Sequence, residues 1–338
     1  MDLDARLTVL GSLNMDISVT VPALPEPGAT VLGGPAAFAP GGKGANQAVA
    51  AARLGRPAGI RVRMVGCVGD DDFGRALRAA LAAEGVDDHA VRTVPGAPTG
   101  IAMITVDEAG ENIITVSPGA NHEAGSPEIA VIGGPSAAPG SPEVLVISAE
   151  VPVPAIRAAL AAAGAGGEDG GPSRLTVLNL APAPPRAEAA AILGARPDWL
   201  VVNESEAAAV LGRPVSGLAE AAGAAAGLVA AGARNAVVTA GAAGAAFHGA
   251  PSEGEHQELS RTVAAFPVRA VDTVGAGDTF VGALAVALAA GVPPVEAVTA
   301  AAAAGAAAAA RPGTQTGMPR PADVRAATGY QWPLADAS

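Results

Sequence analysis

The segment 272–280 has the residue types of a site for phosphoryl transfer. Its sequence is DTVGAGDTF, and we expect an apolar, alanine-rich helix to follow it through about Ala289. Glycines allow consecutive backbone N–H groups to face one anion at a helix N-terminus, where unpaired donors and the helix dipole favour negative charge. Asp278, in the same turn, can accept the proton of an attacking hydroxyl group. The alternative is that Asp278 only caps the helix.

Lys43 is a candidate ligand because the 20 Lys and Arg residues of the chain include only this one lysine. It lies in the glycine-rich segment 41–47, GGKGANQ, where a compact ammonium and a planar guanidinium are not interchangeable. We expect this turn to open a helix that runs to about Leu54 and carries Lys43 and Asn46 on one face. A polar small molecule could bind against that face. The alternative is a solvent-exposed first turn.

Neither glycine-rich segment fits a common nucleotide-binding motif. A Walker A loop needs glycine at position 37 and Ser or Thr at position 44, where the chain has Ala37 and Gly44. The Rossmann pattern G-x-G-x-x-G fails as well, because Gly275 and Gly277 are followed by Phe280. Dinucleotide binding therefore loses its main support.

Polar side chains also follow two strand-like runs. Asn14 and Asp16 stand at alternate positions after the first run, so they project to one side of an extended segment and suit the recognition of hydroxyl groups. Turn-capping by these side chains is the alternative. The segment 203–206, NESE, ends another strand and begins a helix. It could cap that helix, or it could hold a hydrated magnesium ion, which prefers few carboxylates and retained waters.

Composition excludes several classes of partner. The formal net charge of -12 argues against binding to nucleic acid or to an anionic membrane, so an anionic cosubstrate would need a local positive site. The apolar run 298–310 is too short to span a bilayer and predicts a buried helix. The lone cysteine, Cys67, excludes an intrachain disulfide and is expected to be a core thiol. The N-terminus lacks the pattern of a signal peptide, so we expect a cytoplasmic protein.

Strand-like runs alternate with alanine-rich helical stretches along most of the chain. This pattern predicts an α/β fold with a doubly wound, mostly parallel sheet flanked by helices, whose ligands gather at the C-terminal ends of the strands. The runs cover residues 7–11, 63–68, 144–148, 175–179, 199–202 and 236–239.

Two intervals, about 15–39 and 99–116, break this alternation, because their short β-like pieces have no helix between them. We predict that they form a small separate β-sheet that serves as a lid. The expected organisation is a single domain over residues 1–330 with the lid segments inserted, followed by a loosely held tail at 331–338. The Gly, Pro and Ser-rich segments 133–141 and 164–173 are expected to be solvent loops.

Together these segments resemble the ribokinase-like family of sugar kinases, also called the phosphofructokinase B family, over about residues 7–325. The resemblance rests on two motifs, GGKGANQA at 41–48 and DTVGAGD at 272–278. Between them, GEN at 110–112, GAN at 119–121, NESE at 203–206 and TAG at 239–241 follow the order of the family. The resemblance implies the ribokinase-like fold and a cytoplasmic homodimer that pairs through the lid.

The activity that the resemblance implies is the ATP-dependent phosphorylation of D-ribose at the 5-hydroxyl, with Mg²⁺ and a monovalent cation, usually K⁺. The residues that would bind the ribose hydroxyls are Asn14, Asp16, Gly42, Lys43, Asn46 and Glu150, with Asp278 as base. The backbone of Gly275, Ala276 and Gly277 would form the anion hole. The nucleotide side would comprise Asn203, Thr239, Gly241 and Gly277, with Glu206 bound to magnesium through water.

The implied monovalent-cation site comprises Asp272, Val274, Ala308 and Gly313, together with Gly317, which stands where the family has serine. Deoxyribose, a ketohexose or a nucleoside is the alternative substrate. From another class of protein, the alternative is a sugar-binding regulator without catalysis, but such a regulator would be expected to lack Asp278 or the anion-hole glycines, and this chain has both.

Overall fold

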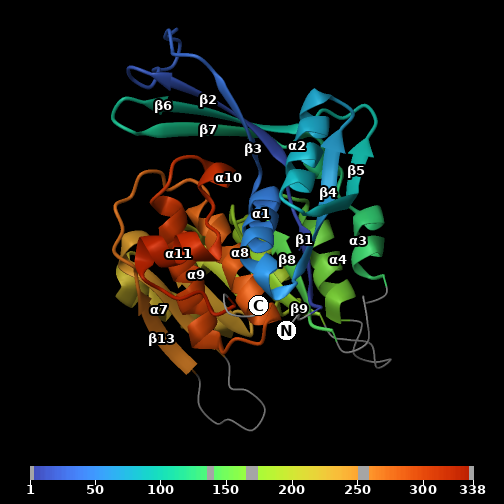
Figure 1. Cartoon of the computed structure of the whole chain (residues 1–338), viewed down its shortest axis with the longest axis vertical. Helices are drawn as coiled ribbons and strands as arrows, with labels where there is room; N and C mark the ends of the chain where they lie inside the picture. Colours follow the sequence, from blue (N-terminus) through green and yellow to red (C-terminus); the bar gives the residue numbers. More distant parts are fainter. Residues whose placement is uncertain (1–3, 135–140, 165–173, 250–258, 335–338) are drawn as a thin grey trace.

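A computed structural model describes residues 4–134, 141–164, 174–249 and 259–334 of the chain (Figure 1). The strands of its large sheet are β1 (Arg6–Leu10), β4 (Arg61–Gly69), β5 (Asp87–Val94), β8 (Glu143–Ser148), β9 (Leu175–Asn179), β10 (Trp199–Asn203), β11 (Asn235–Thr239), β12 (Gly244–Gly249) and β13 (Leu259–Ala264). The helices are α1 (Lys43–Gly55), α2 (Asp72–Ala83), α3 (Ser126–Ile132), α4 (Val153–Gly164), α5 (Arg186–Leu193), α6 (Glu204–Leu211), α7 (Gly217–Ala230), α8 (Ala276–Ala289), α9 (Pro294–Ala309), α10 (Thr314–Gly317) and α11 (Pro321–Thr328).

The large sheet has nine strands in the order β13-β12-β11-β10-β9-β8-β1-β4-β5. The strands from β11 through β5 run parallel, and β12 and β13 add an antiparallel edge. All six residues of β8 are buried, as expected for a parallel strand covered by helices on both faces. All six strands expected from the sequence are present, which confirms the predicted α/β fold.

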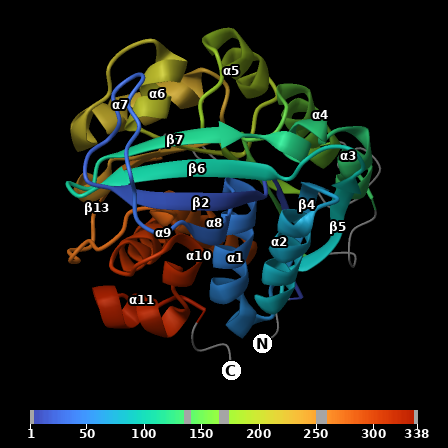
Figure 2. The ribbon, with the colours of Figure 1, turned by 90° about the horizontal axis from the view of Figure 1, so that it is seen from above.

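Helices cover both faces of this sheet and divide the core into two clusters. One cluster packs α1, α2, α8, α9 and α11 against the sheet, and the other packs α3 to α7 against the opposite face. Seen from above, α4 to α7 lie on one side of the molecule, and α1, α2, α10 and α11 lie on the other (Figure 2). Few aromatic residues contribute, so the core consists mainly of Ala, Val, Leu and Ile, as the composition predicts.

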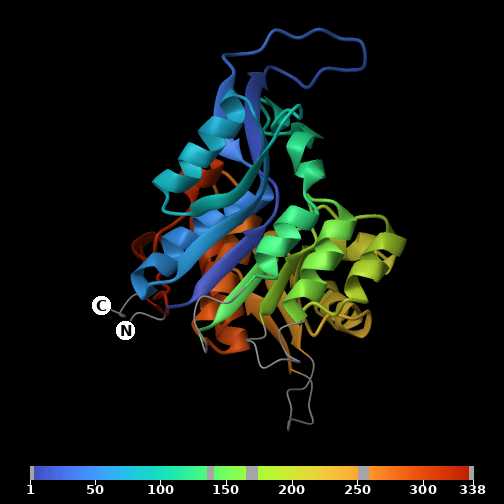
Figure 3. The ribbon, with the colours of Figure 1, turned by 90° about the vertical axis from the view of Figure 1, so that its right-hand side faces the viewer.

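A second, four-stranded sheet lies over the C-terminal strand ends of the large sheet (Figure 1). Its order is β3-β2-β6-β7, and its strands are β2 (Asn14–Val21), β3 (Ala37–Gly41), β6 (Gly100–Asp107) and β7 (Asn112–Ser117). The connection between β2 and β3 projects from this sheet away from the body of the molecule (Figure 3). Both predicted lid intervals thus fall in one small β-sheet.

Further expectations can be compared with the structure. The predicted buried helix at 298–310 corresponds to α9 from Val298 to its end at Ala309. Cys67 is fully buried, which raises the pKa of its thiol to about 12. Most of the predicted loops 133–141 and 164–173 lie outside the described residues. The expectation of a loosely held tail after residue 330 is wrong for Trp332, because its indole is 1% exposed in the core. Among the described helices, none is long and apolar enough to cross a membrane.

Candidate active site

The candidate site lies where the order of the parallel strands reverses. From β1 the chain continues to β4 on one side, whereas β8 pairs with the other side of β1. Ligands of doubly wound folds bind in the crevice that such a reversal opens at the carboxyl ends of the strands. Ser12 follows β1, Glu150 follows β8 and Asn179 ends β9, so three polar side chains meet at this edge.

Two glycines allow the helices α1 and α8 to start at this crevice. Gly42 precedes α1 with a φ of 89°, and a Cβ atom at this position would lie 2.6 Å from the backbone nitrogen of Asn14. Gly275 precedes α8 with a φ of 77°, in the left-handed region that other residues adopt only at a cost. Both helices therefore begin at this crevice, and the first N–H groups of α1 donate to Glu150 and to the Ser12 carbonyl.

Asp278 is the third residue of α8 and is held by two amides of α1. Asn46 Nδ2 donates to Asp278 Oδ2 at 2.9 Å, and Gln47 Nε2 donates to Asp278 Oδ1 at 3.1 Å. Gln47 Nε2 also donates to Asn179 Oδ1 at 3.0 Å. The two helices come close at Gly282, which has no side chain: a Cβ atom there would lie only 2.7 Å from the carbonyl oxygen of Gln47. The carboxylate is thus aimed by side chains that are themselves buried.

Lys43 supplies positive charge among three carboxylates. Its pKa is raised, chiefly by the charge of Asp278 and further by Glu150 and Glu206, although burial opposes the shift. Glu150 accepts hydrogen bonds from the Ser12 hydroxyl and from the backbone N–H of Lys43, the latter at 3.2 Å. The ammonium group is therefore held charged at neutral pH, and it is a local positive site of the kind that the acidic composition requires for an anionic ligand.

Asp16, in the small sheet, has a carboxyl group whose pKa is strongly raised. Burial first, and then the charges of Glu150 and Asp278, raise the pKa of Asp16 to about 7. Asp16 is paired with Ala102 of β6 and Ala39 of β3, so the lid holds this carboxyl over the crevice. Perturbed carboxyl groups of this kind gather at functional sites.

Asn14 lies at the start of β2 and is almost fully buried, with 3% exposure. Its Oδ1 accepts a hydrogen bond from Asn121 Nδ2 at 2.8 Å. Asn121 also bonds both the N–H and the carbonyl of Leu13, so it fixes the connection between β1 and β2. The Nδ2 group of Asn14 remains as the part of this side chain that can donate to a ligand.

Asn203 and Glu206 form a reciprocal capping box at the start of α6. The N–H of Asn203 donates to Glu206 Oε2, and the N–H of Glu206 donates to Asn203 Oδ1, both at 2.8 Å. Burial raises the pKa of Glu206, while the N–H of Asn203 and the charge of Lys43 oppose that rise. The capping alternative is thus realised. The charges of Lys43 and Asp278 also act on Glu206, so one side chain can serve both purposes.

A cavity of about 510 Å³ lies beside the N-terminus of α8. Thr239, Gly241, Ala276 and Gly277 line it, together with apolar residues that include Phe266. The lining thus combines the first residues of α8, which adjoin Asp278 in the chain, with two threonines and an apolar surface. This combination suits a ligand with an anionic end and a flat, weakly polar end.

Asp272 organises the turn that precedes α8. Its Oδ1 accepts from the N–H of Val274 and its Oδ2 from the N–H of Gly313, both at 3.0 Å. Among the described residues, no arginine or lysine pairs with this carboxylate. The carbonyl of Ala308 accepts from the N–H of Arg311 at 3.0 Å, and Gly317 is buried at the end of α10. The predicted cation ligands thus lie in two parts of the chain. Asp272 and Val274 are in the turn before α8, and Ala308, Gly313 and Gly317 are in the segment that faces this turn.

Sequence reasoning gave no role to Gln47, although the residue lies within the GGKGANQ segment. Its contact with Asp278 depends on the crossing of α1 and α8, which residue spacing alone does not reveal. In the sequence, Asn121 appears only within the GAN segment at 119–121, and Asn179 only as the last residue of the strand-like run 175–179. The structure adds Ser12 as well, whose hydroxyl donates to Glu150.

Comparisons with known proteins agree with this geometry. The profile of the pfkB family of carbohydrate kinases matches residues 4–321. Ribokinase of Schizosaccharomyces pombe is 37% identical over 322 residues, which cover 94% of this chain and 96% of the relative. Arabidopsis thaliana ribokinase complexed with ribose and ATP superposes with a TM-score of 0.79 at 27% identity, covering 99% of both chains. The phosphofructokinase-2 of Escherichia coli in complex with potassium gives 0.72 at 25% identity, covering 97% and 98%. The chain belongs to the pfkB family of carbohydrate kinases.

Proposed function

We propose that this kinase transfers the γ-phosphoryl group of ATP to the 5-hydroxyl of D-ribose and releases D-ribose 5-phosphate and ADP. One observation carries the proposal. The Asp278 carboxylate is fixed by Asn46 and Gln47 at the N-terminus of α8, between a cluster of polar groups under the lid and the cavity lined by Thr239 and Gly277. The identity with ribokinase over nearly the whole chain supports ribose as the substrate.

The sugar would bind between the lid and the first turn of α1. Asp16 and Glu150 offer acceptors for sugar hydroxyls, and Lys43 and Asn14 offer donors. Gly42 lets the first turn of α1 pack directly against the backbone of Asn14, next to these groups. Asn46 is hydrogen-bonded at both ends of its amide in the structure, to Asp278 and to Gln315, so a contact between Asn46 and ribose would be an additional one.

Asp278 would act as the base. It takes the proton of the 5-hydroxyl while that oxygen forms a bond to the γ-phosphorus and the bond to the β-phosphate oxygen of ATP breaks. The N–H groups of Gly275, Ala276 and Gly277 would stabilise the charge on the transferring group. Ala276 N–H also donates within the turn, to the Thr273 carbonyl at a long 3.3 Å, which leaves Gly275 and Gly277 as the freer donors.

ATP would occupy the cavity of about 510 Å³, with its phosphates toward Lys43 and its base against the apolar wall. Thr239 and Gly241 line that cavity, and Asn203 caps the N-terminus of α6. Glu206 fits a magnesium ion that keeps its waters, because it offers a single carboxylate in the field of Lys43 and Asp278. A bound magnesium ion would neutralise charge on the phosphates.

We also propose a monovalent-cation site, with potassium as its ion, at Asp272, Val274, Ala308, Gly313 and Gly317. The Asp272 carboxylate accepts only from two backbone N–H groups, and together with the carbonyl oxygens of the other four residues it would offer the oxygen ligands that hard cations prefer. The potassium complex of a pfkB-fold relative supports the assignment. Titrating potassium into a tetramethylammonium buffer should activate the enzyme, and a flat titration in potassium-free protein would remove the cation from the mechanism.

The lid is proposed as the surface of a homodimer in the cytoplasm. Strand register places Phe38 of β3, Met103 of β6 and Ile113 of β7 on the face opposite Asp16. All three are at least 48% exposed. Exposed apolar side chains on one sheet face suit burial against a second copy.

ADP release across candidate acceptors tests the substrate. Ribose, deoxyribose, fructose and adenosine should be compared at equal concentration with saturating ATP, magnesium and potassium. The highest kcat/KM is expected with ribose. A higher value with deoxyribose, fructose or adenosine would reassign the substrate within the family, and no ADP release with any of the four would contradict the proposal.

The raised pKa of Asp16 predicts a pH dependence. With its pKa at about 7, the carboxyl group of the free enzyme is protonated below that pH and ionised above it. An ionised carboxylate accepts stronger hydrogen bonds from two sugar hydroxyls, so kcat/KM for ribose should rise as the pH increases through 7. Asp16→Asn should lower kcat/KM and flatten its profile between about pH 6 and pH 8. A wild-type profile that is flat in this range would remove Asp16 from sugar binding.

The raised pKa of Asp16 also predicts that the stability of the folded protein falls as the pH rises, whereas its kcat/KM for ribose increases. The folded-state pKa lies above the ordinary value of 3.8, so the folded protein binds the extra proton and loses stability as the pH rises from about 4 to 7. Asp16→Asn removes this loss. Its melting temperature should therefore exceed that of the wild type at pH 8 while its sugar kinetics worsen.

A further inference from the structure

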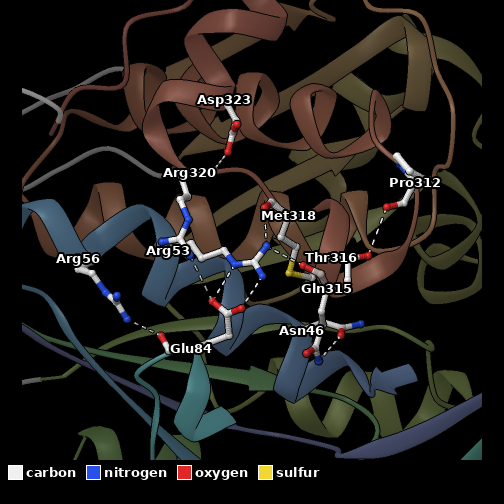
Figure 4. Close-up of polar contacts among 10 residues, drawn as sticks. All are labelled: Asn46, Arg53, Arg56, Glu84, Pro312, Gln315, Thr316, Met318, Arg320 and Asp323. Carbon is white, nitrogen blue, oxygen red and sulfur yellow. Dashed lines mark hydrogen bonds and ion pairs between the residues drawn. The ribbon is translucent and has the colours of Figure 1, made fainter. Parts of the chain in front are cut away.

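Arg53 joins three elements of the structure with one buried guanidinium group (Figure 4). Its Nε and Nη2 donate to the two carboxylate oxygens of Glu84, at the end of α2, at 2.9 and 2.6 Å. Its Nη1 donates to the carbonyl oxygens of Gln315 and Met318 at 2.7 and 2.6 Å. Only 12% of the Arg53 side chain is exposed. The planar fork thus fixes the segment around α10 to helix α1.

Gln315 is held at two points by residues of α1. Arg53 binds its carbonyl oxygen, and its side-chain Nε2 donates to Asn46 Oδ1 at 3.0 Å. Asn46 and Arg53 are seven residues apart, which is about two helical turns, so both face α10. Figure 4 shows Gln315 between them.

The bond from Gln315 completes the hydrogen bonding of the Asn46 amide. An ionised carboxylate only accepts hydrogen bonds, so Nδ2 of Asn46 faces Asp278 Oδ2, at 2.9 Å, and Oδ1 of Asn46 accepts from Gln315 Nε2. Gln315 thus holds the amide from the side opposite the carboxylate. Without this bond, Asn46 would be fixed at one end only.

The same segment also supports the glycine turn before α8. A Cβ atom placed on Gly275 would lie 2.9 Å from Thr314 Cγ2 and 3.6 Å from Met318 Cε, so both side chains pack against that turn. Helix α10 has only four residues, and so short a helix does not hold its position without tertiary contacts. A shift of α10 would reach both the partner of Asp278 and the turn that carries the anion-hole amides.

We propose that Arg53 is a positioning residue for phosphoryl transfer, acting through Gln315 and Asn46 on Asp278. The inference rests on the proposed role of Asp278 as base. Arg53 does not itself touch the reacting atoms. Arg53 keeps Gln315 in the position from which it holds the amide of Asn46 against the carboxylate. Loss of the Arg53 guanidinium should therefore lower kcat.

A purely structural role for the Arg53–Glu84 ion pair is the alternative. Two other arginines approach Glu84: Arg56 donates to its carbonyl at 2.8 Å, and Arg320 lies 3.9 Å from its carboxylate. Glu84 would therefore keep cationic neighbours without Arg53, whereas Gln315 and Met318 would lose the side chain that binds their carbonyls. The two roles predict different kinetics.

The test compares Arg53→Lys, Gln315→Ala and the double variant in the ribose kinase assay. Each single variant should lower kcat about 10- to 100-fold, with the KM of ATP within about twofold and that of ribose within about threefold, because small displacements of catalytic groups have effects of this size. The double variant should be no more than about twofold slower than the slower single variant, since both break one connection. Arg78→Lys is the matched control, because Arg78 pairs with Asp88 at 2.7 Å in a different place. It should keep kcat within about twofold.

Three results would overturn the inference. Values of kcat within twofold of wild type for both single variants would leave Arg53 a purely structural role, and losses that multiply in the double variant would show two independent effects. If Arg53→Lys does not fold, an unchanged kcat in Gln315→Ala is enough to overturn the inference.

Asp278→Asn, measured in parallel, separates this inference from the proposed function. An inactive Asp278→Asn with unaffected Gln315→Ala leaves the proposed function standing, whereas an active Asp278→Asn removes both.

Discussion

Replacing Asp278 by asparagine should lower kcat about 10²- to 10⁴-fold, the range that a positioned general base contributes. Asparagine keeps the volume of the side chain and can still bond one of the two amides, so ribose should bind within about tenfold of the wild-type affinity. The buried position of Asp278 and its bonds to Asn46 and Gln47 explain why the carboxylate is held ready before substrate arrives. Single-turnover kinetics and ribose titration by calorimetry measure the two quantities separately.

Asp323→Asn is the matched control for this experiment. Asp323 is also the third residue of its helix, α11, and it accepts from the N–H of Arg320 at 2.8 Å as a helix cap. The control should retain kcat within about twofold. If Asp278→Asn kept more than about a tenth of the wild-type kcat, the cap that the sequence left open as an alternative would be the correct role, and the assignment of the base would be wrong.

Lys43→Met should lower kcat/KM by about 10²-fold, comparable to the loss of one preorganised donor in an active site. Lys43 lies in the field of Asp278, Glu150 and Glu206, which raise its pKa and so keep it charged. Without this cation, the carboxylates repel one another and repel the phosphates of ATP. Lys43→Arg should mainly raise the KM of ribose, because a planar guanidinium cannot reproduce a compact donor beside Gly42.

Arg75→Met controls for the loss of a surface charge. Arg75 pairs with Asp70 and Asp72, and its side chain is 64% exposed. This variant should have wild-type constants. Steady-state constants of Lys43→Arg and Lys43→Met that both match the wild type would show that Lys43 is only a surface charge.

The parts of the fold that depend on local pattern could be predicted from the sequence. The helices at Lys43–Gly55 and Ala276–Ala289 begin at glycine-rich turns and end within a residue of the expected positions. Strands such as Glu143–Ser148 are continuous apolar runs, which buried parallel strands require.

The edges of the large sheet were harder to predict. Strand β5 (Asp87–Val94) includes two aspartates, a histidine and an arginine, because an edge strand is only partly buried. Strand β12 (Gly244–Gly249) is rich in alanine and glycine, which lack the β-branched signal of a strand. Its pairing with β11 comes from a hairpin and from burial under α7 and α9, both of which depend on the complete fold.

Within the site, residue type identified the chemical groups but not their partners. Asp278, Lys43 and Asp16 stood out by their setting, whereas the bonds from Gln47 to Asp278 and from Arg53 to Gln315 span 231 and 262 residues of sequence. The pKa of Asp16 is likewise a product of burial and of two distant carboxylates. These hydrogen bonds and this pKa shift exist only in the folded protein, where the small sheet, α1 and α8 lie next to one another.

The position of the phosphate in the product tests the central claim most directly. The purified enzyme should be incubated with ribose, ATP, magnesium and potassium, and the sugar phosphate examined by phosphorus NMR with proton coupling. Phosphorus on the 5-oxygen couples to the two diastereotopic protons of the adjacent CH₂ group, whereas phosphorus on the anomeric oxygen couples to a single proton. We predict a single ester on the CH₂ group, formed at least about 10²-fold more slowly in a parallel reaction with Asp278→Asn. An anomeric ester, or ATP that remains unconsumed in the presence of ribose, would contradict the account.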